Sequence, residues 1–130
     1  MTLFEECIQA LGDKVEIMSS EKTQELFKHL VKNYPVTSWG RIDWDKIKEK
    51  YKIHFPQESL KILNKKYPDH LNNIVFLLWN YSDATCVKTE LQRALDCIDD
   101  VTAVGSDTWI YCPTEYVIEF FHEGEVTLGF

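Results

Sequence analysis

The side chains best suited to acid–base chemistry in this sequence are two pairs of closely spaced carboxylates. One pair is Asp99–Asp100, and the other is Glu123 and Glu125 on either side of Gly124. General acid–base catalysis needs a carboxyl group whose pKa is tuned by its surroundings. The first pair is expected in a turn ahead of a strand and the second at a hairpin turn, both solvated places. We therefore predict no catalytic role for either pair.

Metal binding and nucleophilic catalysis have no better support. No two cysteines or histidines lie at the local spacing of a zinc-ligand pair. No glycine-rich phosphate loop, G-x-S-x-G turn or H-E-x-x-H motif is present. The sequence predicts a protein that is not an enzyme and binds no metal ion or cofactor. The four cysteines are expected to be small apolar residues that form no disulfide. They are Cys7, Cys86, Cys97 and Cys112, and the four histidines are His29, His54, His70 and His122.

The first half of the chain has the apolar spacing of helices. Such spacing occurs in four segments, residues 4–11, 20–34, 44–51 and 55–68. Gly12 and Pro35 are expected to end the first two helices. Ser20 is the N-cap candidate of the second helix and Asp43 that of the third. In the third, Trp44, Ile47 and Tyr51 are expected to share one face.

The second half reads mainly as strands. Residues 73–80 and 84–88 are predicted to form a hairpin around a Tyr81-Ser82-Asp83 turn. A capping box over 89–92 predicts one helix, and further strands follow over 101–104, 108–112, 116–122 and 126–130, with Gly105 and Gly124 in hairpin turns. The predicted fold class is α+β: N-terminal helices packed on a mostly antiparallel C-terminal β-sheet with one inserted helix. Since no linker or repeat interrupts the chain, residues 1–130 are expected to form a single domain.

The segment SWGRIDWDKI, residues 38–47, contains half of the tryptophans of the chain. We interpret it mainly as a structural clasp, in which Gly40 permits a tight bend and Arg41 pairs with Asp43 or Asp45. Trp44 is expected to pack into the core. Trp39 lies in the loop, and its alternative role is an anchor that faces a partner, since exposed tryptophan is frequent among interface hot spots.

Charge is distributed unevenly along the chain. Residues 1–80 contain twelve Lys and Arg against eleven Asp and Glu, whereas residues 81–130 contain two against ten. This excess of acid argues against nucleic acid as the partner of the second half and suits a basic partner. The lysines at 46, 48, 50 and 52 are interpreted as a solvated helix face, with a nucleic-acid groove as the alternative.

Two segments together resemble a known family. SWGRIDWDKI and the last 32 residues, from Asp99 to Phe130, are similar to immunity proteins of bacterial contact-dependent growth inhibition systems. Within the second segment, Asp107-Thr108-Trp109, Val117 to Phe120 and His122 to Glu125 carry the closest similarity. The resemblance covers residues 36–130 and does not extend to the first 35.

The resemblance implies a cytosolic inhibitor that binds the toxic C-terminal domain of a cognate effector. Such toxins are often nucleases, with transfer RNA among their targets, and an acidic inhibitor suits their basic clefts. No direct contact with nucleic acid is expected, because of the excess of acid in the second half. No contact with a membrane is expected either, since the longest apolar run has only six residues. The other hypotheses are an acidic adaptor domain and a small enzyme with an unrecognised site. The predicted toxin contacts are Asp83, Asp99, Asp100, Asp107, Glu119, Glu123, Glu125 and Trp39.

Overall fold

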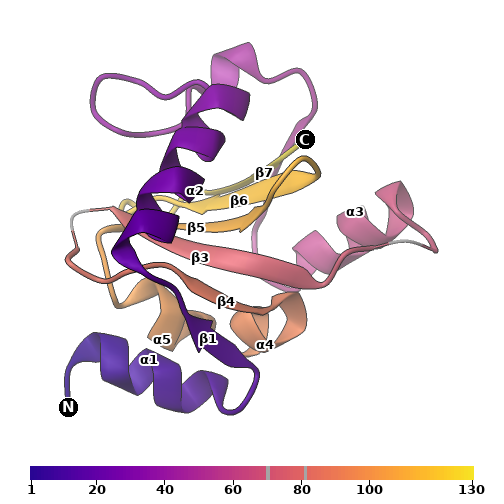
Figure 1. The fold of residues 1–130 in the computed structure, drawn as a ribbon. Helices are drawn as coiled ribbons and strands as arrows, with labels where there is room; N and C mark the ends of the chain where they lie inside the picture. Colours follow the sequence, from indigo (N-terminus) through magenta and orange to yellow (C-terminus); the bar gives the residue numbers. More distant parts are fainter. Residues whose placement is uncertain (70, 81) are drawn as a thin grey trace.

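The centre of the molecule is a seven-stranded antiparallel sheet (Figure 1). The computed structural model describes residues 1–69, 71–80 and 82–130. The strand order is β1-β4-β3-β5-β6-β7-β2, so that both edges come from the first half of the chain. The strands are β1 (Val15–Ile17), β2 (Lys50–Lys52), β3 (Ile74–Asn80), β4 (Val87–Glu90), β5 (Asp107–Cys112), β6 (Tyr116–Phe120) and β7 (Val126–Gly129).

Helices cover both faces of this sheet. Helix α2 (Ser20–Asn33) crosses one face, while α1 (Leu3–Leu11), α4 (Leu91–Asp96) and α5 (Ile98–Thr102) lie on the opposite face (Figure 1). Helix α3 (Glu58–Lys66) inserts its buried Leu63 into the core on the side of α1. The predicted α+β class is confirmed, and the inserted helical segment is divided at Cys97 into α4 and α5. None of the helices in the described ranges is long and apolar enough to cross a membrane.

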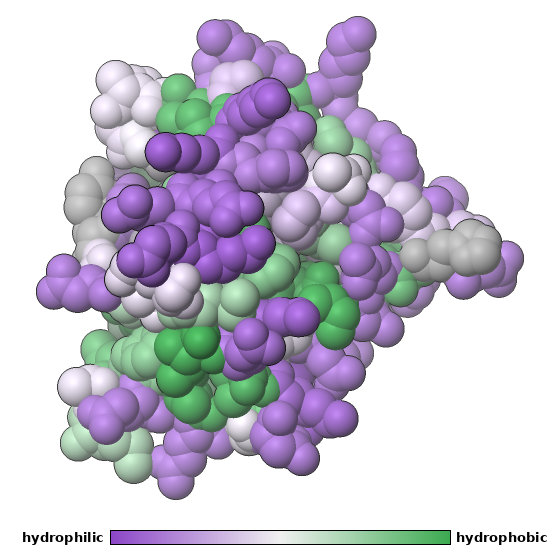
Figure 2. Space-filling view, viewed as in Figure 1, coloured by the Kyte–Doolittle hydropathy of each residue, from purple (hydrophilic) through white to green (hydrophobic). Residues whose placement is uncertain are grey.

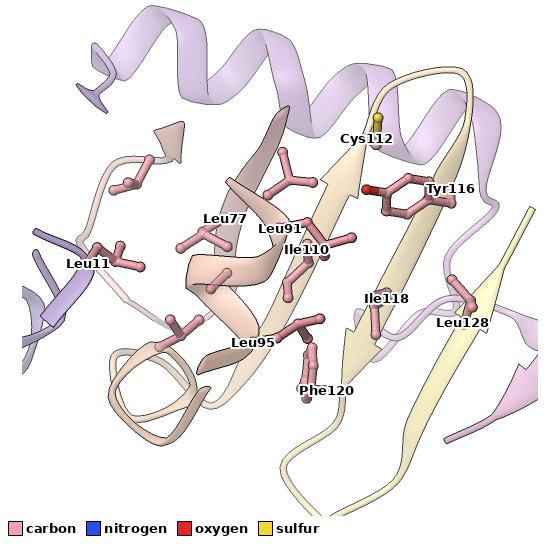
Figure 3. Close-up of a cluster of buried hydrophobic side chains, with 14 of the residues drawn as sticks. Leu11, Leu77, Leu91, Leu95, Ile110, Cys112, Tyr116, Ile118, Phe120 and Leu128 are labelled. Atoms are coloured by element: carbon pink, nitrogen blue, oxygen red, sulfur yellow. The ribbon is translucent and has the colours of Figure 1, made fainter. Parts of the chain in front are cut away.

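The alternation of side chains along the strands produces two hydrophobic cores. Tyr116, Ile118 and Phe120 of β6 face the core shared with α1 and α4. Figure 3 shows this core, in which Ile110 and Ile118 lie beside Leu91 and Leu95 of α4. The intervening positions face α2, whose Leu26 and Leu30 complete the second core. The central strands are therefore buried on both sides.

Local sequence signals account for the helix ends in the first third of the chain. Thr2 caps α1 in a capping box with Glu5, and Gly12 follows the helix with a φ of 74° that favours glycine. Ser19, one residue before the predicted Ser20, caps α2 by accepting a hydrogen bond from the backbone of Lys22. These helix ends need no tertiary contact.

The helix predicted over residues 44–51 is wrong. Trp44–Lys46 form only a 3-10 turn, η1, and the chain then becomes the edge strand β2, which pairs with β7. Asp43 precedes η1 but makes no side-chain capping bond, and Tyr51 is exposed. Pairing with an available sheet edge has outweighed the helical spacing in a segment too short for a stable helix.

Three further predictions in the second half are wrong, and a fourth is confirmed. The capping box over 89–92 does not form, because Thr89 belongs to β4 and its hydroxyl donates to the Lys14 carbonyl. Residues 101–102 end α5 instead of beginning a strand. Gly105 has no positive φ; a side chain there would approach the Asn80 carbonyl oxygen to 2.8 Å. The predicted hairpin of β3 and β4 is confirmed, although Tyr81 lies outside the described residues.

Candidate functional site

Several connections of the sheet leave it at one end. Strand register pairs the last residue of β3, Asn80, with the first of β5, Asp107, and pairs Phe120 of β6 with Val126 of β7. The β3–β4, α5–β5 and β6–β7 connections therefore lie at the same end, which we call the turn end (Figure 1). Carboxylates far apart in the sequence gather there, as the acidic composition of the second half suggested.

Five of the predicted contact acids are exposed. Asp83 lies in the β3–β4 connection, and Glu123 and Glu125 lie in the β6–β7 turn. Asp99 and Asp100 lie in the first turn of α5 and not in a turn ahead of a strand. Because α5 leads into the connection to β5, these two acids lie beside the turn end instead of within it. Three of the five exposed acids thus share the turn end and two lie on the helix that leads to it; we call these five residues the acidic margin.

Asp107 is a structural residue. Its side chain is only 3% exposed. One oxygen accepts hydrogen bonds from the backbone nitrogen of His122, at 2.8 Å, and is 3.0 Å from Nδ1 of the same residue. Asp107 is therefore buried in this structure, where its carboxylate holds the β6–β7 turn against the start of β5, and its contact with a toxin stays a prediction.

Glu119 is also buried, with a side chain 1% exposed, and it organises the loop before η1. Its Oε1 accepts from Nε of Arg41 and Nε1 of Trp44, both at 2.9 Å. Its Oε2 accepts from the backbone nitrogen of Ile42, at 2.8 Å, and from Nε1 of Trp109, at 3.1 Å. Four donors satisfy the charged carboxylate, which makes its burial tolerable. Donors from within the protein thus occupy both oxygens of Glu119, and its contact with a toxin stays a prediction.

Arg41 joins this buried site to the surface. Besides Glu119, its guanidinium binds Glu125 at 2.6 Å and lies 4.2 Å from the ring centroid of Phe121. Burial tends to lower the pKa of Arg41, but the hydrogen bonds and charges of the two carboxylates raise it overall. The hydrogen bond and charge of Arg41 in turn lower the pKa of Glu125. The predicted pairing with Asp43 or Asp45 is therefore wrong, and the partners are instead on β6 and in the β6–β7 turn.

The loop from Pro35 to Asp43 is a closed clasp on the sheet. The Asp43 backbone nitrogen donates to the Pro35 carbonyl, Val36 and Ile42 form a β-bridge, and Gly40 adopts a φ of 87°. The predicted clasp and its tight bend are confirmed. Trp39 lies at the tip with 65% of its surface exposed.

Behind this tip is an open groove of about 460 Å³. It runs between the clasp and the edge strand β2, where Lys50 and Lys52 are exposed. These lysines lie at alternate positions of a strand and not on the helix face that was predicted. With Glu125 on the same groove, the lining carries charges of both signs. The groove therefore shows no uniform charge that would select a nucleic acid.

Chemistry beyond binding has little geometric basis. His122 and Asp107 form an acid–base pair, but among the described residues no hydroxyl or thiol is hydrogen-bonded to His122. Burial raises the pKa of the Cys7 thiol to about 11 and that of Cys112 to about 12, so both are protonated near neutral pH. In the described part of the chain, which excludes His70, no three His, Cys, Asp or Glu side chains could hold a metal ion together.

Sequence reasoning missed the carboxylates and apolar residues contributed by α1 and β1. Glu5 and Glu6 add to the charge of the neighbouring α5, and Ile17 on β1 is 53% exposed. No motif marks these residues. The one signal available for the clasp was the presence of arginine at position 41 in a half otherwise supplied with lysine, since arginine is preferred in paired, partly buried sites.

A comparison with protein families gives the remaining evidence. The model of a family described as "CdiI immunity protein EcoliA0-like" matches residues 1–129. The match includes the first 35 residues, which the resemblance of the later segments did not reach. No curated protein matches the sequence.

Proposed function

Because the chain belongs to the CdiI immunity protein family, we propose that it neutralises a basic nuclease toxin of its contact-dependent growth inhibition system by occupying the toxin's substrate-binding cleft. Family membership makes the chain an immunity protein of such a system, with a cognate toxin as its partner. The nuclease character of the toxin, with transfer RNA as one candidate target, belongs to the proposal. The proposal also includes that the immunity protein inhibits the toxin without catalysis and that it acts inside the producing cell.

The observation that carries the proposal is the gathering of exposed carboxylates along one margin. The chain has a net charge of −7, and residues 81–130 contribute ten acids against two bases. Nuclease clefts are positively charged because they hold phosphates. An acidic protein surface attracts such a cleft at long range, which speeds association and excludes the phosphate chain once bound.

Trp39 adds an apolar element to this surface. It stands at the tip of the clasp, and the clasp is tied to the β6–β7 turn through Arg41 and Glu125. A rigid support lowers the entropy cost of binding through an exposed side chain. We therefore propose that Trp39 contacts the toxin beside the acids of the turn end.

The first experiment combines protection in cells with binding in solution. The toxin domain is expressed with and without the immunity protein, and growth and the integrity of transfer RNA are followed. Purified toxin domain, separated from the complex in denaturant and refolded, is then titrated by calorimetry. Protection without binding, or binding to a toxin that leaves nucleic acids intact, contradicts the nuclease proposal.

The second experiment locates the surface with charge reversals. Asp83, Asp100 and Glu123 are changed together to lysine, and the control changes Glu21, Glu25 and Asp69 to lysine. Each reversal adds two charges, so both triple variants move from −7 to −1. Protection should be lost only in the first variant, while circular dichroism shows both folded. Equal affinity of the two variants at low salt rejects the acidic margin as the binding surface.

A further inference from the structure

An apolar groove lies between α1 and the edge strand β1. It has a volume of about 340 Å³ and is lined by Met1, Phe4, Glu5, Ile8, Gln9 and Ile17. Figure 2 shows apolar side chains gathered over this part of the molecule, surrounded by polar ones. Because β1 is the last strand at this edge of the sheet, no neighbouring strand covers Ile17.

Some of the apolar side chains that line this groove are exposed and do not belong to the core. Phe4 and Ile8 pack partly against the core, but Ile17 is 53% exposed and Met1 is 79% exposed. Single exposed apolar residues are ordinary on protein surfaces, whereas a group contributed by two elements marks a site of interaction. Edge strands are usually protected by charge, and Glu16 supplies that protection on the other face of β1.

The helices α1 and α5 carry acids, of which Glu5 lines the groove itself. Helix α1 carries Glu5 and Glu6, and α5, which packs against it, carries Asp99 and Asp100. Neither helix contains a lysine or arginine. Hydrogen bonds from Thr2 lower the pKa of Glu5, which keeps that side chain ionised. The groove therefore favours a partner that is basic around an apolar protrusion.

We infer that the α1–β1 groove anchors an apolar side chain of the cognate toxin, while basic residues around that side chain face the acids of α1 and α5. This inference rests on the proposed function and adds a second contact area to it. An apolar centre within a charged rim is the usual arrangement of an interface hot spot. The acids of α1 and α5 should mainly affect the rate of association, and the apolar groove should mainly affect the rate of dissociation.

The test compares Ile17→Lys with Val31→Lys. Val31 is a matched control, since it is 44% exposed and lies on α2, across the sheet from α1. Binding of the purified toxin domain is measured by biolayer interferometry. Ile17→Lys should weaken affinity by about tenfold or more, mainly through faster dissociation, and Val31→Lys should not change it.

Each outcome distinguishes this inference from the proposed function. If wild-type protein fails to bind the toxin domain, the proposed function fails, and this inference fails with it. If wild type binds and both variants bind equally well, or both weaken equally, the groove is not the anchor and the proposed function stands. If circular dichroism shows that Ile17→Lys does not fold, Ile17→Thr takes its place, because threonine keeps the β-branched shape. A dissociation rate of Ile17→Thr equal to that of wild type overturns the inference. If the wild-type protein is a dimer and Ile17→Lys is a monomer, the groove binds a second copy of the chain, and the inference is also overturned.

Discussion

Replacing Glu119 by glutamine tests whether the buried carboxylate holds the clasp in place. Each carboxylate oxygen accepts two hydrogen bonds: Oε1 from Arg41 and Trp44, Oε2 from Ile42 and Trp109. In Glu119→Gln one oxygen becomes an amide nitrogen, which donates. Whichever way the amide turns, two donors lose their acceptor and face another donor: either the partly buried Arg41 and Trp44, or the buried Ile42 and Trp109.

The magnitude follows from those two donors. Leaving a buried donor unsatisfied costs about 1–3 kcal/mol, and removing the charge of one partner of a buried ion pair costs about 3–5 kcal/mol. The two estimates describe overlapping losses and are not added. We expect Glu119→Gln to lower the free energy of unfolding by about 3–5 kcal/mol, a large part of the roughly 5–15 kcal/mol of a typical domain.

The assay is equilibrium unfolding in urea, followed by far-ultraviolet circular dichroism and by tryptophan fluorescence, since Trp44 and Trp109 both contact Glu119. The control is Glu123→Gln, the same change at an exposed position of the neighbouring turn, which should alter stability by no more than about 0.5 kcal/mol. A loss below about 1 kcal/mol in Glu119→Gln, at an unchanged denaturant slope, refutes the reasoning.

Three further predictions concern packing, thiol reactivity and pH. A side chain at Gly129 would clash with the Trp44 ring, so Gly129→Ala should destabilise the fold by about 1–3 kcal/mol in the same urea assay, and an unchanged midpoint contradicts this. With a thiol reagent at neutral pH, native protein should show one fast-reacting cysteine, Cys97, because Cys7, Cys86 and Cys112 are buried; four should react in denaturant, and two or more fast native thiols would disprove the burial. The lowered pKa of Glu125 means that its pairing with Arg41 stabilises the fold above the ordinary pKa of 4.5 and is lost as pH falls through the lowered value. The stability difference between wild type and Glu125→Gln should therefore vanish in acid, and a difference that grows in acid contradicts the pairing.

Local signals in the sequence determined much of the fold. The spacing of Phe4, Ile8 and Leu11 with Gly12 after them defined α1, because periodicity and a glycine cap act within a few residues. The strand predicted over residues 116–122 is β6, and its alternation puts Glu119 on the face opposite Ile118, since successive strand residues point to opposite sides. The excess of acid in the second half likewise followed from composition alone.

The tertiary structure decided which of these acids remain exposed. Glu119 and Asp107 have the same chemistry as Glu123 and Asp83, yet the first two are buried and the last two exposed. The difference depends on partners supplied from far along the chain, such as Arg41, which is 78 residues from Glu119. Strand β2 was likewise expected as part of a helix, because its partner β7 is far along the chain, with Tyr51 pairing with Leu128. Local sequence patterns carry no information about such distant pairs, whose hydrogen bonds exist only after the sheet has assembled.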